Sequence, residues 1–277
     1  MTIPNVAVIG LGCIGGSIVE SLPSDAARVR GWSASPEDRA MARALGYAVP
    51  DTMELALAGA DVIVIAVPVQ AIAGVAAEAI RYAPEQATIF HCGGVQSRAS
   101  LHLDEAASAR VIGTHPLAGS HESGFGAARG NLFQGCAVSV ESRRSTEQER
   151  WAKWLWSAVG AERIDYRAAE SHDVLMAWMS HLPQLASTAL AATFAAEHID
   201  PKSVGPGARD TTRLSASAFE QWAELLKAQP AVLETALARL EATVADIRHA
   251  LAQDDQRGLR QLWDSAREWR RAAEPPA

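Results

Sequence analysis

Cysteine is scarce in this sequence, and the cysteines that are present form no pattern. The 277 residues include three of them, Cys13, Cys92 and Cys136, an odd number at wide spacing. Disulfide-stabilised domains and structural zinc sites use paired or closely spaced cysteines. The sequence therefore argues against a disulfide framework and a zinc site, and it favours a reducing compartment. We expect no bound metal.

Positive charge and long apolar runs are lacking as well. Lys and Arg number 25 against 32 Asp and Glu, so the formal net charge is -7. Without a basic field, nucleic acid and anionic lipid are not expected partners. No run of about 18 apolar residues occurs, and the N-terminus enters a strand pattern without the features of a signal peptide. We therefore expect a cytoplasmic protein that does not span a membrane.

Hydrophobic residues, 48% of the sequence, are arranged in two successive patterns. In the first, short runs rich in Val and Ile alternate with Ala-rich stretches, which is typical of a parallel sheet covered by helices on both faces. The expected strands are residues 6–9, 29–32, 61–67, 88–91, 111–114, 137–140 and 162–164. After Tyr166 strand-like runs vanish, and Ala, Leu and Glu recur at helical spacing. Prolines and glycines within 200–217 predict one loop among these helices.

A glycine motif follows the first expected strand directly. Gly10, Gly12 and Gly15 form a Gly-x-Gly-x-x-Gly pattern between that strand and a helical stretch. The first glycine permits a tight turn, the second lets the backbone approach a pyrophosphate, and the third allows the helix to pack on the strand. This context favours a dinucleotide site over a glycine-rich turn without a ligand. Further expected cofactor-binding residues are Cys13, Ile14, Val67 and Pro68.

The two patterns and the motif together predict the fold class and the domains. We expect an α/β protein with an N-terminal Rossmann domain, a doubly wound parallel sheet, at residues 1–165. An all-helical C-terminal domain for substrate binding and dimerisation is expected at residues 166–277. The chain is thus predicted to be a nicotinamide-dependent oxidoreductase.

The end of the second strand bears on the choice between NAD and NADP. An Asp or Glu at this point usually binds the ribose 2′-hydroxyl of NAD, but here the strand ends in Trp32 followed by Ser33 and Ser35. The two serines are able to donate hydrogen bonds to a 2′-phosphate, although no Arg follows immediately. They equally suit the N-terminus of a helix that starts near Pro36. The sequence weakly favours NADP as the cofactor and does not exclude NAD.

Four separated motifs resemble the prephenate and arogenate dehydrogenase family. They occur in the family's order and span nearly the whole chain. They are His-Pro-Leu-Ala-Gly-Ser at 115–120 with Leu-Phe-Gln-Gly at 132–135, His-Asp at 172–173 with Ser-His-Leu-Pro at 180–183, the stretch 205–213 ending Asp-Thr-Thr-Arg, and Trp222. The resemblance implies NAD(P)-dependent oxidative decarboxylation of a cyclohexadienyl dicarboxylate, prephenate or arogenate, to an aromatic product.

The resemblance also assigns roles to residues. It makes His115 the group that hydrogen-bonds the ring hydroxyl and accepts its proton, and a neutral imidazole at a strand end suits that role. His181 matches the second active-site histidine, although in an Ala- and Leu-rich helix it is also a candidate for a core residue. Arg213 matches the clamp on a substrate carboxylate. Further implied substrate-binding residues are Asp210, which would orient the Arg213 segment, Gly94, Ser120 and His121.

The sequence departs from the family pattern near the fourth strand. Where most members read Asp-x-Gly-Ser-x-Lys, this chain has His91, Gly94 and Gln96 in place of Asp, Ser and Lys, and His121 replaces a usual Glu. Gly94 removes a hydrogen-bond partner of the ring substituent and opens space for another group such as an amine. Ser97 or a water would be alternative partners. Relatives that convert 4-amino-4-deoxyprephenate to 4-aminophenylpyruvate in antibiotic biosynthesis are therefore the alternative.

Two other classes of protein remain as competing hypotheses. One is a non-catalytic dinucleotide-binding sensor, against which the presence of His115, His181 and Arg213 speaks. The other is a β-hydroxyacid dehydrogenase, but such enzymes use a catalytic lysine in the helical domain. Lys202 and Lys227, the lysines of that region, lie in no matching motif.

The C-terminal helices carry more apolar surface than so small a layer buries alone. They contain four tryptophans, Trp178, Trp222, Trp263 and Trp269. Large apolar surfaces of this kind mark protein contacts. We expect a homodimer formed through these helices, as in the family, and no appended regulatory domain.

Replacing Arg213 by lysine tests the clamp that the resemblance implies. A point ammonium does not reproduce the planar, bidentate hydrogen bonds of a guanidinium on a carboxylate. We expect Arg213→Lys to raise the Michaelis constant for the substrate about 10-fold or more. Steady-state kinetics measure the effect, and wild-type constants would remove Arg213 from the site.

Overall fold

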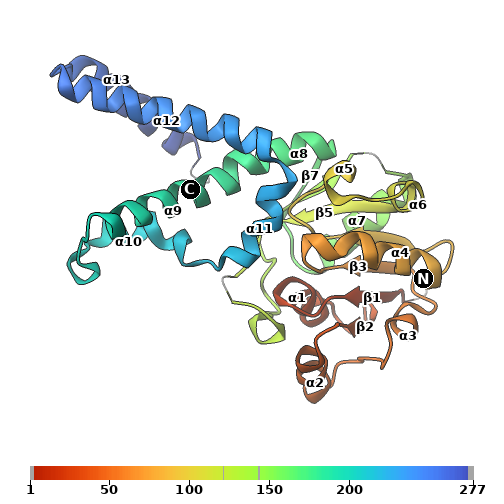
Figure 1. Ribbon diagram of the computed structural model, residues 1–277. Helices are drawn as coiled ribbons and strands as arrows, with labels where there is room; N and C mark the ends of the chain where they lie inside the picture. Colours follow the sequence, from red (N-terminus) through yellow and green to blue (C-terminus); the bar gives the residue numbers. More distant parts are fainter. Residues whose placement is uncertain (1–2, 121, 143, 274–277) are drawn as a thin grey trace. The chain divides into compact units, whose positions relative to one another are not determined.

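The computed structural model describes residues 3–120, 122–142 and 144–273. The chain forms two compact units, Met1–Gln229 and Pro230–Ala277. The first contains a sheet of seven strands among the described residues, in the order β2-β1-β3-β4-β5-β6-β7 (Figure 1). The strands are β1 (Asn5–Ile9), β2 (Arg28–Trp32), β3 (Val62–Ile65), β4 (Thr88–His91), β5 (Val111–Pro116), β6 (Ala137–Glu141) and β7 (Arg163–Arg167). Each of the seven predicted strands is therefore confirmed, with ends shifted by a few residues.

The sheet differs from the prediction in the direction of its last two strands. β1 to β5 are parallel to one another, but β6 is antiparallel to β5, and β7 is parallel to β6. A parallel pairing needs a crossover that returns the chain to the other edge, usually by a helix. Among the described residues of the connection 117–136, all but residue 121, the short helix η2 (Phe125–Ala127) is the one helix, so β6 starts at the edge where β5 ends.

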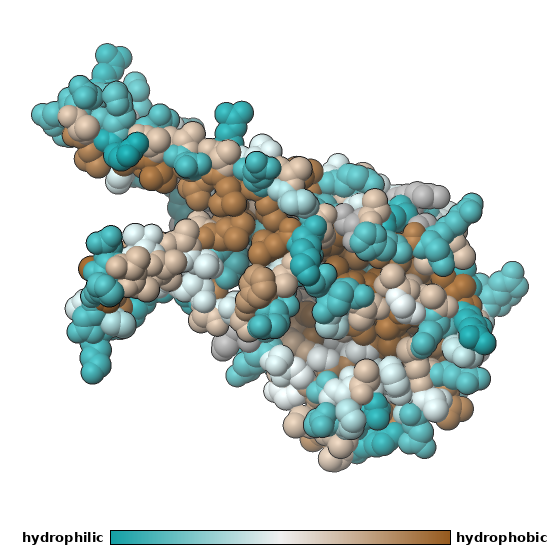
Figure 2. Space-filling model, in the orientation of Figure 1, coloured by the Kyte–Doolittle hydropathy of each residue, from teal (hydrophilic) through white to brown (hydrophobic). Residues whose placement is uncertain are grey.

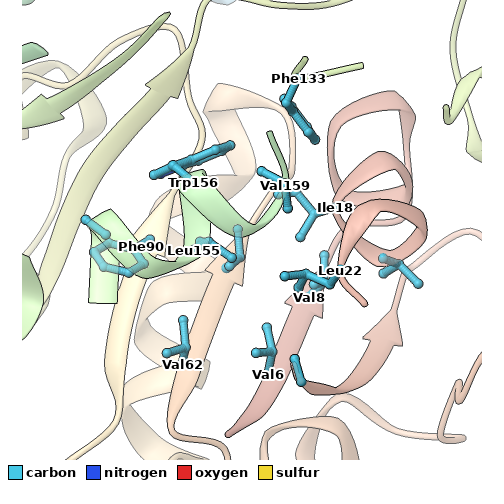
Figure 3. Close-up of a cluster of buried hydrophobic side chains, with 14 of the residues drawn as sticks. Val6, Val8, Ile18, Leu22, Val62, Phe90, Phe133, Leu155, Trp156 and Val159 are labelled. Carbon is cyan, nitrogen blue, oxygen red and sulfur yellow. The ribbon is translucent and has the colours of Figure 1, made fainter. Parts of the chain in front are cut away.

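Helices cover both faces of the sheet. Alternate residues of a strand point to opposite faces, so Val6 and Val8 lie in one buried cluster while Ala7 and Ile9 lie in another. Figure 3 shows the first cluster, in which Trp156 packs with residues of the central strands. The helices of this part are α1 (Cys13–Ser21), α2 (Pro36–Ala44), α3 (Met53–Leu57), η1 (Val69–Ala71), α4 (Ile72–Tyr82), α5 (Arg98–Leu101), α6 (Glu105–Arg110) and α7 (Thr146–Ala158). The predicted doubly wound α/β fold is confirmed.

No strand follows β7 in the described part of the chain. The rest of the first unit consists of α8 (Ala169–Met176), η3 (Ala177–His181), α9 (Leu182–Ala196), η4 (Pro201–Ser203), α10 (Pro206–Thr212), η5 (Arg213–Ala216) and α11 (Phe219–Ala228). The helical C-terminal half is thus as expected. The boundary after residue 165 stays a prediction, and the compact unit continues to Gln229.

The predicted loop over 200–217 is wrong, because most of that segment is helical. Gly205 is the N-cap of α10, and Pro206 occupies its first turn. Proline is well suited to that position, since its fixed φ matches the helix and its missing N–H would have no partner there. The prolines and glycines of this segment therefore begin a helix instead of preventing one.

The second unit is a helical hairpin of α12 (Pro230–Ala252) and α13 (Gln256–Ala272). Asp255 caps α13 by accepting the backbone N–H of Gly258 at 2.9 Å. Large apolar side chains remain exposed on the hairpin, including Trp263 at 59% and Trp269 at 61%. Figure 2 shows that hydrophobic residues also lie on the surface of this hairpin. Among the described residues, no helix combines the length and apolar character that crossing a bilayer requires.

Candidate active site

The glycine-rich turn lies between β1 and α1, where the strand order reverses direction. Gly10 has a φ of +97°, and a Cβ there would lie 2.3 Å from the Ala66 carbonyl oxygen. A Cβ on Gly15 would lie 1.8 Å from the Gly10 carbonyl oxygen. A Cβ on Gly12, by contrast, would meet nothing within 4 Å. Close packing thus requires the first and third glycines, while the second borders open space.

That open space lies over the N-terminus of α1. Gly12 is the extended N-cap of the helix, and no side chain caps the first amides. Free amides and the helix dipole make such an end an anion site. Val67, which follows β3, lies beside Gly10, since its Cγ1 is 2.9 Å from the position of a Gly10 Cβ. The geometry therefore fits a dinucleotide pyrophosphate. Cys13, Ile14 and Val67 are partly exposed here, and Pro68 is exposed.

The two serines after β2 make local hydrogen bonds. Ser35 caps α2 by accepting the backbone N–H of Asp38 at 3.0 Å, as the helix-cap interpretation expected. The Ser33 hydroxyl lies 3.5 Å from Asp38 Oδ2, so a carboxylate that the strand itself lacks comes from α2. Arg39, which sequence reasoning missed, lies 5.7 Å over the Trp32 ring and donates to the carbonyl of Ser33. Its signal was its place in the first turn of the helix that was expected to start near Pro36.

The segment after β5 approaches the glycine-rich turn. His115 lies inside β5, paired in register with Ser139 of β6, and not beyond the strand as predicted. The backbone N–H of Arg129 donates to the Ser17 hydroxyl of α1 at 2.9 Å, and the Ser120 hydroxyl accepts the backbone N–H of Glu122. The glycine-rich turn and the segment after β5, which are far apart in sequence, thus lie at the same edge of the sheet. His121 lies outside the described residues.

His115 belongs to a chain of hydrogen-bonded side chains. Its Nδ1 lies 3.0 Å from His172 Nε2, and His172 Nδ1 lies 2.8 Å from Asp173 Oδ1. His172 and Asp173 are on α8 and are buried. Sequence reasoning quoted this His-Asp pair as part of a motif but gave it no role. The adjacent histidine and aspartate within that motif were the available signal.

Gly94 faces His115 directly. A Cβ on Gly94 would lie 3.7 Å from His115 Nε2 and 3.5 Å from Leu225 Cδ2 of α11. The other two altered positions of this segment are buried in the protein interior: His91 accepts the backbone N–H of Gly93 through Nδ1, and Gln96 donates from Nε2 to the Ser139 carbonyl. Of these three positions, Gly94 is thus the one next to the imidazole nitrogen.

Burial favours the neutral form of three histidines at this site, His115, His91 and His181. Desolvation, followed by repulsion from charge on His172 and His91, lowers the pKa of His115 to about 3. Desolvation likewise lowers the pKa of His91 to about 4 and lowers the pKa of His181. At neutral pH His115 is therefore uncharged and able to accept a proton. No group of three or more His, Cys, Asp or Glu side chains in the described ranges is arranged to hold a metal ion.

His181 ends a π-helical turn between α8 and α9. Pro183, two residues on, lacks the N–H that would continue regular helical bonding to Met179, and π turns are frequent at functional sites. His181 packs edge-on against Trp222 at 5.9 Å between ring centroids. Its Nδ1 is buried without a hydrogen-bond partner among the described residues, which leaves it available to a ligand.

Arg213 and Asp210 lie on the segment that packs beside α9. Gln184, one turn after His181, donates to the carbonyl of Leu214, which anchors η5 there. The Arg213 side chain is exposed and has no ion pair with any described residue. Asp210 is also exposed, and no contact with another described side chain gives it the orienting role expected. The structure thus brings His115, Gly94, His172 and the glycine-rich turn together, and it leaves Asp210 on the surface.

Comparison with protein families identifies both halves of the chain. Residues 23–164 match the family model described as prephenate dehydrogenase, nucleotide-binding domain, and residues 168–264 match prephenate dehydrogenase, dimerization domain. A cyclohexadienyl dehydrogenase of Zymomonas mobilis is 29% identical over 265 residues, which cover 91% of this chain and 89% of the relative. A prephenate dehydrogenase of Bacillus subtilis is 25% identical over 279 residues, 96% of this chain and 75% of the relative.

Solved structures show the same fold. A prephenate dehydrogenase of Aquifex aeolicus, in complex with hydroxyphenyl propionate and NAD+, superposes with a TM-score of 0.88 at 23% identity, covering 99% of each chain. An arogenate dehydrogenase of Synechocystis superposes with a TM-score of 0.82 at 23% identity, covering 98% of this chain and 100% of its own.

Substitutions of Gly12 and Gly15 distinguish a glycine that makes room for a ligand from a glycine that close packing requires. We expect Gly12→Val to fold normally, because its extended backbone tolerates valine and its Cβ meets nothing. Dinucleotide affinity should fall about 100-fold or more, about 2.7 kcal/mol. Gly15→Val, the matched control, should instead destabilise the fold through the clash with the Gly10 carbonyl. Calorimetric titration and thermal unfolding measure the two effects. Unchanged dinucleotide binding by Gly12→Val would contradict this assignment of the turn.

Proposed function

The chain belongs to the prephenate dehydrogenase family, and we propose that it catalyses the NAD(P)-dependent oxidative decarboxylation of a prephenate-type cyclohexadienyl acid, prephenate or arogenate, to an aromatic product. One observation carries the proposal: a neutral imidazole, His115, presents Nε2 toward the space at Gly94 on the strand edge where the glycine-rich turn lies. A base beside a dinucleotide site is what removal of a hydride and a proton from one carbinol needs.

The proposed chemistry divides between the chain and the bound cofactor. The nicotinamide, when bound, supplies the hydride acceptor. His115 Nε2 takes the proton of the ring hydroxyl, and loss of the ring carboxylate as carbon dioxide leaves its electron pair in the ring. The ring becomes aromatic, and its oxygen takes the proton back from His115. Substrate thus loses one hydride and one carbon dioxide, with no net release of a proton.

The exposed and unpaired side chain of Arg213 supports its role as the clamp on a substrate carboxylate. The orphaned and buried Nδ1 of His181 supports a second contact with the substrate, because an unpaired buried nitrogen is costly without a ligand. Ser120 and His121, on the segment after β5, remain proposed substrate-binding residues.

A second candidate substrate is 4-amino-4-deoxyprephenate. The specific observation in its favour is the missing side chain at Gly94, where a serine hydroxyl would stand next to His115 Nε2. Without that hydroxyl, the site has lost a hydrogen-bond partner suited to a ring oxygen and has gained room for an amine. His115 would accept a proton from the amine in the same way.

For the cofactor we propose a preference for NADP, with Arg39 as the 2′-phosphate ligand. Arg39 is partly exposed at the end of β2, where its guanidinium rests on Trp32. A planar guanidinium is well suited to a phosphate. The carboxylate of Asp38 lies beside Ser33 and opposes this preference, although its Oδ1 already accepts the backbone N–H of Phe125 at 2.8 Å. Arg39→Ala should therefore weaken NADP binding more than NAD binding.

We also propose a homodimer, formed through the C-terminal helices, in the cytoplasm. The match of residues 168–264 to a dimerization domain supports the assembly. So do the exposed apolar side chains of the hairpin, among them Trp263, Trp269 and Leu251, because water-exposed apolar patches of this size favour burial against a partner.

A substrate panel tests the proposed reaction. Purified protein receives prephenate, arogenate and 4-amino-4-deoxyprephenate, each with NAD and with NADP, while absorbance reports the reduced nicotinamide. We expect turnover of at least one substrate and loss of that turnover in His115→Asn, with cofactor affinity unchanged. Dinucleotide binding without turnover of any substrate would overturn the proposal in favour of a sensor.

Gly94→Ser tests which ring substituent the site prefers. If the site is suited to an amine, the added hydroxyl should shift the ratio of specificity constants toward prephenate by about 1 to 3 kcal/mol, about 5- to 150-fold. The ratio is measured on the wild type and the variant with both substrates. An unchanged ratio would show that position 94 does not discriminate the substituent and would favour prephenate itself.

A further inference from the structure

A chain of hydrogen bonds connects His115 to a carboxylate in the protein interior. His172, which links the two, has no exposed surface, and Asp173 is 3% exposed. Neither residue is needed as a reacting group in the chemistry proposed above. Burying an imidazole and a carboxylate costs free energy unless their polar atoms are bonded, so their arrangement points to a role of their own.

The Asp173 carboxylate sets the direction of these hydrogen bonds. Its Oδ1 accepts the backbone N–H of Gln96 and its Oδ2 that of Ser97, each at 2.8 Å. Backbone amides only donate, so both carboxylate oxygens act as acceptors. His172 Nδ1, which also bonds Oδ1, therefore carries a proton. In an uncharged imidazole with its single N–H at Nδ1, Nε2 is an acceptor, and this is the form of His172 that the proposal below assigns.

The same reasoning extends to His115. Because His172 Nε2 accepts, His115 Nδ1 must donate across the 3.0 Å that separates them. Neutral His115 then carries its lone pair on Nε2, the atom nearest to Gly94. No other hydrogen bond to the His115 ring occurs in the part of the chain that the structure describes.

We propose that His172 and Asp173 are positioning residues, which hold His115 in the tautomer protonated at Nδ1 so that Nε2 is free to take the proton of the substrate. The catalytic consequence rests on the function proposed above, whereas the tautomer itself does not. The proton moves from the ring substituent to Nε2 and returns to it, and the Nδ1 proton stays between the two histidines throughout.

The surroundings of His115 explain why another residue is needed to fix its tautomer. Neutral imidazole exists in two tautomers, and only one of them leaves Nε2 able to accept a proton. Burial keeps the His115 ring neutral. Charge on His91 or His181 would also affect the pKa of His115, but neither residue forms a hydrogen bond with its ring among the described residues. The choice between the tautomers therefore depends on His172. In a catalytic triad, the wrong tautomer lowers turnover by about 10⁴-fold.

The nitrogen NMR spectrum of the histidine rings tests the tautomer without substrate or cofactor. The protein contains eight histidines, and the signals missing from the spectrum of His115→Asn identify His115. At about pH 7.5 we expect a protonated Nδ1 and an unprotonated Nε2 in the wild type. A proton on Nε2 of His115 in the wild type would overturn the proposal, whatever the variants do.

Two substitutions of His172 separate orientation from packing. His172→Phe keeps a ring but offers no acceptor, so the His115 proton should move to Nε2. His172→Gln retains a side-chain carbonyl within reach of Nδ1 and should restore the wild-type tautomer. His249→Gln, an exposed histidine on α12, is the control and should leave the His115 signals in place. An unchanged His115 tautomer in folded His172→Phe would contradict the proposal.

Kinetics connect the tautomer to catalysis. With a substrate that the wild type converts, His172→Phe should lower kcat about 100-fold or more with KM changed less than about 3-fold, and His172→Gln should recover at least about 10-fold of that loss. Equal loss in both variants would indicate a structural role and overturn the positioning role. A correct tautomer in a protein that turns over no substrate would instead refute the proposed function and leave the tautomer assignment intact.

Discussion

The carboxylate of Asp173 is the point on which the site depends. It lies in the interior on α8, and it accepts hydrogen bonds from the backbone of Gln96 and Ser97, which follow β4, and from His172. A buried carboxylate is tolerated only when its oxygens are satisfied. These hydrogen bonds connect α8 to the segment that follows β4. They also fix the imidazole of His172 and, through it, His115.

Two constraints of different kinds meet at that edge of the sheet. The glycine-rich turn is a steric constraint, since Gly10 and Gly15 leave no room for a Cβ whereas Gly12 leaves room for a ligand. The histidine chain is a hydrogen-bonding constraint. The segment after β5 connects the two, because it leaves the strand next to His115 and its Arg129 backbone N–H donates to the Ser17 hydroxyl of α1. The proposed cofactor turn and the proposed base therefore lie at the same edge of the sheet, where the carboxyl ends of the parallel strands β1 and β5 are found.

The departures from the family pattern divide into two kinds once their burial is known. His91 and Gln96 lie inside the protein, where His91 accepts from Gly93 and Gln96 donates to the sheet, so they replace charged groups by neutral ones in the interior. Gly94 alone among these three borders the space beside His115. Space gained at Gly94 bears on the substituent that the site accepts.

The sequence by itself determined the elements and the cofactor turn. Each strand of the sheet is a short apolar run bounded by turn residues, and the spacing of Gly10, Gly12 and Gly15 directly after the first strand marks the turn. His115, Gly94 and Arg213 were found only through resemblance to a family, since no local pattern marks them. The helix at Pro206 follows a local preference of proline for the first helical turn, whereas tertiary structure decided the direction of β6 and the contact of His115 with His172. The last joins residues 57 positions apart, and such contacts depend on how elements pack, which local periodicity does not encode.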